Sequence, residues 1–127
     1  MLYVKEAKGS VEEVCKKVEA ATVANKFGVL GWIDLKAKMN AKGVPFGPEV
    51  RVVEVCSPAQ AKKALETAMV ISTVLPCRIS IFQEGGKVKV AALKASALLG
   101  LFGRAELAPL AQEVDASVAS IIDLACA

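Results

Sequence analysis

The sequence has 127 residues, of which 54% are hydrophobic, and this size and composition suit one domain with a single packed core. A net charge of +3, from 16 basic and 13 acidic residues, is too small to indicate a nucleic-acid-binding protein. The longest apolar run, residues 95–102, is about half of the ~18 residues that a membrane-spanning helix needs. The chain contains no His, so neither a Ser-His-Asp nor a Cys-His catalytic group can be built within it. We therefore expect a single domain over residues 1–127 with neither nucleic acid nor a membrane as a partner.

The cysteines and the N-terminal residues indicate in which cellular compartment the protein is expected. The chain has four cysteines, which would pair as disulfides only in an oxidising environment. Residues 1–5 lead directly into a strand pattern, without the apolar segment of a signal peptide. The sequence therefore predicts reduced thiols and a cytoplasmic location.

The first two elements are a strand and a helix. Residues 2–6 alternate between apolar and polar side chains, which predicts a short strand. Ser10 and Glu13 have the spacing of a capping box, so a helix is expected to begin at residue 11. Its apolar residues recur at helical spacing to about Asn25. Cys15 lies on the buried stripe of this helix and is interpreted as a core residue.

Two strands flank a short helix in the next segment. A strand is predicted after Gly28, over about residues 28–35, and a short helix over residues 35–41 that stops at Gly43. A proline-containing loop leads to a third strand over residues 49–56. Simple alternation along the second strand would place Leu30, Trp32 and Asp34 on one face.

A helix and a hairpin follow the third strand. Ser57 is the expected cap of a helix over about residues 58–67, with Pro58 at its first position. An irregular crossing over residues 70–75 leads to a predicted hairpin, which turns at Gly85-Gly86 and has its strands at residues 77–84 and 87–93.

The C-terminal part is predicted to be helical. The apolar segment 95–103 is expected to be a short helix on the core, with a mobile flap or a dimer contact as alternatives. A final helix is expected over about residues 106–125, with Pro109 in its first turn. Hairpins mixed with helical crossovers predict an α+β two-layer sandwich, in which helices pack on one face of a mixed or antiparallel sheet of about five strands.

The second face of that sheet offers a partner surface. We assign to it the only tyrosine, the only tryptophan and one phenylalanine of the expected strands, namely Tyr3, Trp32 and Phe82. Large aromatic side chains on an outer face are typical of a contact surface. The sequence therefore predicts a homodimer through this sheet, with a cluster covered by the chain's own loops as the alternative.

Several short motifs resemble those of the domain of unknown function 302 family, the Thermus-type α/β sandwich proteins. The resemblance covers nearly the whole chain, and its most specific part is a Cys-x-Pro motif followed by a Leu-Pro-Cys motif. The matching residues are Phe27–Leu30, Ile33–Lys36, Lys42–Val44, Val55–Pro58, Ala61, Ala64–Leu65, Leu75–Ile79 and Leu107–Ala111.

The resemblance implies an α+β sandwich that tends to dimerise and has no established activity. Members commonly carry Asn between the motif cysteine and proline, where this chain has Ser57. Serine can still cap the following helix. A role of the Asn amide in holding a ligand does not carry over to this chain.

Cys56, Ser57, Cys77 and Arg78 form the candidate thiol site, because two cysteines stand beside prolines at strand ends. The first interpretation is packing. The second is a redox pair or a sulfur-accepting thiol, since Cys56 precedes a helix N-terminus whose dipole lowers a thiol pKa. Arg78 could add positive charge. The third is a soft metal, Cu(I) or Zn, for which two thiolates without His are too few unless two copies share a site.

Two functional hypotheses follow. The first is a small homodimeric protein without catalysis that binds a small apolar or sulfur-containing ligand, and it requires no cofactor. The second is a thiol-based redox or sulfur-handling protein that uses Cys56 and Cys77. No residue is assigned a catalytic role under the first hypothesis.

Overall fold

A computed structural model describes all residues from 1 to 127. Five strands, five α-helices and two short 3₁₀ helices follow one another along the chain. Their bounds are β1 (Leu2–Ala7), α1 (Val11–Ala24), β2 (Gly28–Asp34), α2 (Leu35–Ala41), β3 (Val50–Cys56), α3 (Pro58–Thr67), η1 (Met69–Val74), β4 (Cys77–Glu84), β5 (Lys87–Leu93), α4 (Ala95–Gly100), η2 (Ala105–Leu107) and α5 (Ala108–Ala125).

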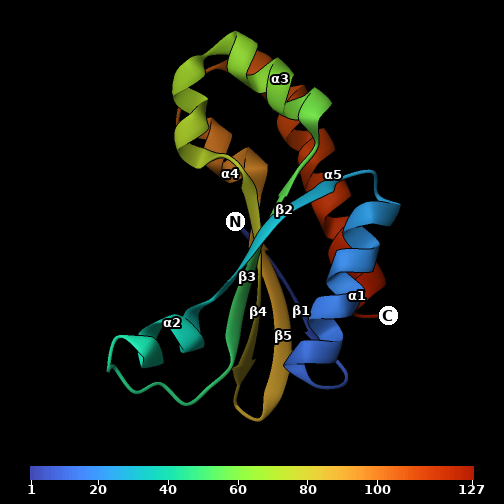
Figure 1. Ribbon diagram of the computed structural model, residues 1–127. Helices are drawn as coiled ribbons and strands as arrows, with labels where there is room; N and C mark the ends of the chain where they lie inside the picture. Colours follow the sequence, from blue (N-terminus) through green and yellow to red (C-terminus); the bar gives the residue numbers. More distant parts are fainter.

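The five strands form one antiparallel sheet in the order β1-β5-β4-β3-β2. Helices α1 and α5 pack side by side on one face of it, while α3 and α4 lie beyond one end of the strands and α2 lies away from the α1–α5 layer (Figure 1). The predicted α+β sandwich with about five strands is thereby confirmed.

Local signals in the sequence explain where several elements begin and end. The Ser10 side chain accepts from the Glu13 N–H and the Glu13 carboxylate reaches back to the Ser10 N–H, so the predicted capping box is confirmed. Gly43 follows α2 with a φ of +76°, a left-handed conformation that glycine adopts without a Cβ clash. Pro109 lies in the first turn of α5, as predicted.

The buried side chains form two clusters. The larger lies between the sheet and the α1–α5 layer, where alternate residues of β4 and β5 meet the buried stripes of both helices; its fully buried members include Val14, Val18, Val53, Val55, Ile79, Ile81, Val90, Ile121 and Ile122. Cys15 belongs to it, as expected. The smaller cluster lies among the helices beyond the strand ends and consists of Ala64, Ile71, Leu99, Leu107 and Ala111. Helix α5 contributes to both clusters.

The three aromatic side chains do not share one face of the sheet, and the sequence-based assignment is wrong for two of them. Tyr3 pairs with the buried Ala92, and its hydroxyl donates to the Asp123 carboxylate of α5. Trp32 pairs with the buried Val53, and its indole N–H donates to Glu19 of α1. Both therefore lie on the helix-covered face.

A bulge in β2 explains the error for Trp32. The register against β3 shifts by one residue between Val29 and Gly31, because Leu30 is an extra residue in the strand. Val29 and Trp32 consequently face the helices together, whereas strict alternation places them on opposite sides. Phe82 is the one aromatic of the three on the uncovered face, where it pairs with Val50.

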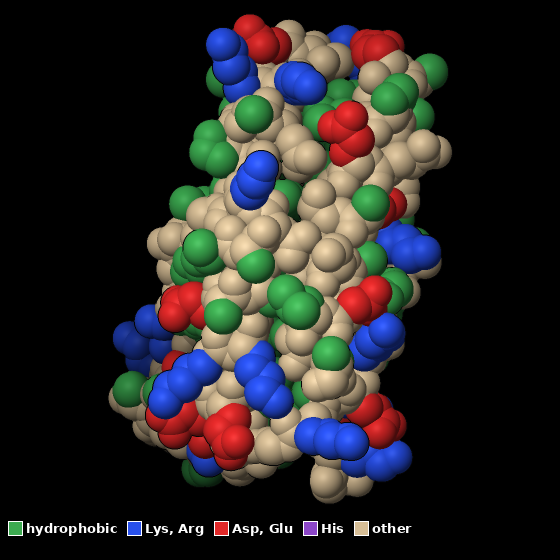
Figure 2. Space-filling model, turned by 90° about the vertical axis from the view of Figure 1, so that its right-hand side faces the viewer, with side chains coloured by type: hydrophobic (Ala, Val, Ile, Leu, Met, Phe, Trp, Pro, Cys, Tyr) green, Lys and Arg blue, Asp and Glu red, His purple; other side chains and the backbone are tan.

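The outer surface of the helix layer carries no large apolar patch. Figure 2 shows this side, with Lys and Arg interspersed with Asp and Glu and with hydrophobic side chains scattered among them. Such a surface is typical of a solvent-facing helix layer. No helix of the chain is both long and apolar enough to cross a membrane.

Candidate functional site

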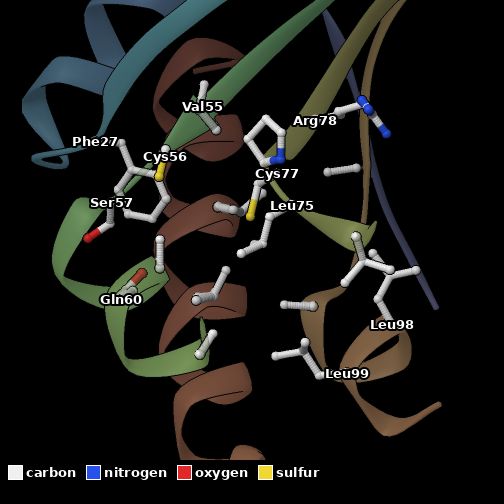
Figure 3. A pocket seen from close by; sticks show the side chains of 18 of the residues that line it. Phe27, Val55, Cys56, Ser57, Gln60, Leu75, Cys77, Arg78, Leu98 and Leu99 are labelled. Carbon is white, nitrogen blue, oxygen red and sulfur yellow. The ribbon is translucent and has the colours of Figure 1, made fainter. Parts of the chain in front are cut away.

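A cavity of about 200 Å³ lies between the two buried clusters, where β3 ends and β4 begins. Its walls come from these two strand ends and from helices α3, α4 and α5 (Figure 3). Of the 20 residues that line it, 16 are hydrophobic. A lining of this kind, with few polar groups, is typical of a small-molecule site.

Small side chains leave this space open. Four of the lining residues are alanines, Ala61 and Ala64 on α3, Ala92 on β5 and Ala95 on α4. Larger apolar residues such as Leu98, Leu99 and Leu110 complete the lining. The apolar segment predicted over residues 95–103 thus contains a short packed helix, α4, with Leu99 buried in the smaller cluster.

The two motif cysteines both line this cavity. Val55 pairs directly with Cys77 across β3 and β4, so Cys56 is a near neighbour of Cys77 at the ends of adjacent strands. The two sulfur atoms lie on the cavity wall (Figure 3). Both side chains are half-buried and neither is in a disulfide.

The apolar surroundings disfavour the charged form of both thiols. Burial raises the pKa of Cys77 to about 11, and the neighbouring Cys56 adds to this effect. Burial also raises the pKa of Cys56. This direction is opposite to the lowering expected from the helix N-terminus, and its cause is the loss of solvation.

The family assignment agrees with this architecture. The profile described as "Domain of unknown function DUF302" matches residues 3–125. The chain belongs to the DUF302 family. A crystal structure of an uncharacterized conserved DUF302 protein from Bacillus stearothermophilus has the same fold, with a TM-score of 0.94 and 25% sequence identity over 99% of this chain and 98% of that chain. No curated protein matches the sequence. The resemblance inferred from the motifs is confirmed, and the family description assigns no activity.

The other two residues of the predicted thiol site lie on different sides of this DUF302 fold. Ser57 lines the cavity and occupies the N-cap position of α3, but its side chain makes no capping hydrogen bond. The Arg78 side chain is exposed and pairs with Glu54 at 3.4 Å on the uncovered face of the sheet. Figure 3 shows the guanidinium directed away from the cavity. Arg78 therefore supplies no positive charge beside the thiols.

Gln60 is a lining residue that the sequence analysis missed. Its Oε1 atom is buried and has no hydrogen-bond partner within the chain. Its spacing in the sequence could have revealed it, since Gln60 and the buried Ala64 are one turn apart and share a face of α3. A polar side chain on the buried stripe of a helix is informative because buried polar groups are normally hydrogen-bonded.

The chain offers few metal ligands at this site. The chain has no group of three or more His, Cys, Asp or Glu side chains that could hold a metal ion. Two thiols alone fall short of the four ligands that structural zinc takes. A Cu(I) or Zn site shared by two copies of the chain stays a prediction, which elemental analysis of protein purified without oxygen would test.

Proposed function

We propose that this chain is a small binding protein that takes an apolar ligand into the cavity and performs no catalysis of its own. The observation that carries the proposal is the cavity itself, about 200 Å³ in volume and lined by 16 hydrophobic residues out of 20. An apolar cavity of ~150 Å³ is large enough for benzene in another protein. The cavity therefore accommodates a molecule of about one aromatic ring.

The state of the thiols supports binding over reaction. A nucleophilic cysteine needs a substantial thiolate fraction near neutral pH. The raised pKa values of Cys56 and Cys77 reduce that fraction. In a binding site the same neutral thiols are small polarizable groups that suit an apolar or sulfur-containing ligand.

The proposed test uses toluene as the probe and a paired set of substitutions on α3. Toluene should raise the Tm of the native protein, since a ligand that binds only the folded state stabilises it. Ala61→Leu fills part of the cavity and should abolish most of this rise. Ala59→Leu makes the same change at an exposed position of α3 outside the lining and should preserve it. The absence of any Tm rise and of any NMR contact between toluene and the native protein would refute the proposal.

A homodimer through the uncovered face of the sheet is the second part of the proposal. Five residues lie in one row across all the strands, and only one of them is polar: Val4, Ala91, Ser80, Val52 and Ile33. Beside this row, Leu2 and Leu93 form a neighbouring pair and are 60% and 47% exposed. An apolar row that crosses the whole sheet on its uncovered face favours a contact surface.

The area of that face is sufficient for a dimer. Strands ~4.8 Å apart and about seven residues long give five strands a face of roughly 500 Å². Two such faces bury roughly 1,000 Å², near the lower limit for a specific interface. The charges on this face are paired within the chain, as for Arg78 with Glu54 and Lys89 with Glu84, so their burial leaves no lone charge.

Sedimentation equilibrium tests the dimer with two substitutions of the same kind. Val52→Glu places a charge within the apolar row and should yield a monomer. Leu124→Glu places a charge on α5, where the native side chain is 55% exposed, and should leave the dimer intact. A native protein that sediments as a monomer at every concentration tested would end this part of the proposal.

Thiol–disulfide exchange is the second candidate function, because two cysteines line one cavity. In that reaction the Cys56 thiolate attacks a low-molecular-weight disulfide and releases one thiol. Cys77 then displaces the second thiol and forms a Cys56–Cys77 disulfide, so the chain loses two hydrogens and the small disulfide gains them.

Oxidised glutathione distinguishes this candidate from simple binding. Exchange should yield an intramolecular disulfide in the native protein, detected by mass spectrometry. Cys56→Ser and Cys77→Ser should each prevent it, whereas Cys126→Ser, a half-buried cysteine outside the cavity, should not. Loss of stability in the two variants, with no disulfide in the native protein, would leave packing as the role of both thiols.

A further inference from the structure

One polar atom at the cavity lacks a partner in the chain. Gln60 Oε1 is buried and accepts no hydrogen bond from any protein group. Figure 3 places Gln60 on the α3 side of the cavity, next to Ser57. A buried acceptor that gave up its bonds to water costs free energy unless a donor reaches it. No protein group supplies this donor, and because Gln60 lines the cavity, a molecule that enters it can do so when the amide turns toward that space.

The rest of the lining argues against a single water molecule in this role. A buried water usually has two to four polar partners. Apart from the first turn of α3, the lining is mostly apolar, with Ala61, Ala64 and Leu99 among its residues. A ligand that carries a donor on an apolar body matches these walls better than water does.

The charge of the ligand follows from the same lining. No Asp or Glu lines the cavity, so a buried ammonium group would have no counter-charge. Arg78 is the only basic lining residue, and its guanidinium pairs with Glu54 on the uncovered face. A carboxylate or phosphate would therefore also lie unpaired. The lining therefore suits a neutral ligand.

We infer that the cavity selects a neutral ligand of about one aromatic ring that carries a single hydroxyl or N–H group, which donates a hydrogen bond to Gln60 Oε1. The inference rests on the proposed binding function and adds the chemical class of the ligand. Phenols and small alcohols belong to this class, whereas pure hydrocarbons lack the donor.

Three probes of similar size test this class: toluene without a polar group, phenol with a donor, and anisole with the same oxygen methylated. The ratio of phenol to toluene affinity, measured by NMR titration, should fall in Gln60→Met by roughly 2- to 10-fold, the range expected for one hydrogen bond. Gln112→Met makes the same change on an exposed part of α5 outside this cavity and should leave the ratio unchanged.

The outcomes separate this inference from the proposal on which it rests. If toluene binds and Gln60→Met leaves the ratio unchanged, the donor requirement is refuted while apolar binding stands. If none of the three probes binds to the native protein, the binding function itself is refuted. Comparison of phenol with anisole in the native protein needs no substitution, and anisole binding as tightly as phenol would also overturn the inference.

Discussion

Cys56 and Cys77 both line the cavity at the ends of adjacent strands, because the β3–β4 ladder pairs Val55 with Cys77 and ends there. Each thiol lies where a strand meets a proline, and neither has a positive group beside it, since Arg78 faces the other side of the sheet. This proximity of two neutral thiols in an apolar setting determines how they respond to pH.

The first prediction concerns the rate of alkylation. Burial raises the pKa of both thiols, that of Cys77 to about 11, so iodoacetamide should modify both more slowly at pH 7 than it modifies cysteine in the unfolded chain. Site-resolved mass spectrometry across a pH series measures each rate. A reaction midpoint for Cys56 at or below that of free cysteine (~8.5) would contradict the prediction and favour the thiol-exchange function.

The second prediction concerns stability at high pH. The folded chain holds the Cys77 proton more tightly than the unfolded chain, in which the pKa is near the ordinary value of 9.0. The protonated Cys77 thiol therefore makes its full contribution to the free energy of unfolding below pH 9, and this contribution is lost as the pH rises toward 11. Each pKa unit is worth about 1.4 kcal/mol, so the loss is at most about 3 kcal/mol.

Denaturant unfolding of the native protein and of Cys77→Ala isolates this contribution. Tyr3, Lys5 and Cys15 titrate in both proteins, so their effects cancel in the difference. The difference in free energy of unfolding between the native protein and the variant should fall between pH 8 and pH 11, by no more than about 3 kcal/mol. Parallel stability curves over that range would show that the thiol is no less solvated in the fold than in the unfolded chain.

Much of the fold was predictable because its signals are local. The Ser10–Glu13 capping box, Gly43 after α2 and the Gly85-Gly86 turn each act within a few residues, and each lies where the sequence predicted it. The sheet face on which each strand side chain lies was less predictable. The bulge at Leu30 depends on the pairing of β2 with β3, which no local pattern specifies.

The candidate site was predictable only in part. The sequence identified Cys56, Ser57 and Cys77, which all line the cavity, from the motifs at the strand ends. The cavity depends on how α3, α4 and α5 meet beyond the sheet, so a sequence pattern cannot reveal its volume. Burial is also a tertiary property, and it reversed the expected direction of the Cys56 pKa shift.

The third prediction uses the only tryptophan of the chain. Trp32 lies on the helix-covered face and donates to Glu19 Oε1 at 3.1 Å, so a partner on the opposite sheet face does not contact it. Dilution of the proposed dimer, and the Val52→Glu variant, should therefore leave the emission maximum of Trp32 unchanged. Unfolding should shift it to the red and serves as the control. A shift on dilution would move the contact surface toward the α1 side of the molecule.

The fourth prediction concerns helix α4, whose residues Leu98 and Leu99 close one wall of the cavity. Leu99 is buried in the smaller cluster, so α4 is part of the packed structure even without a ligand. Toluene in the cavity should slow hydrogen exchange of the α4 amides, because exchange that requires opening of this wall also requires loss of the ligand. The slowing can reach about 100-fold when the toluene concentration is 100 times its Kd.

Helix α2 provides the internal control for this experiment. It has no buried residue and contributes nothing to the cavity lining, so its exchange should not respond to toluene. Equal slowing in α2 and α4 would indicate a general stabilisation of the fold rather than closure of the cavity wall. If exchange slows in neither helix at a toluene concentration that raises the Tm, the bound toluene lies elsewhere on the protein. A ligand against Leu98 and Leu99 must be released before that wall opens, so it would slow exchange in α4.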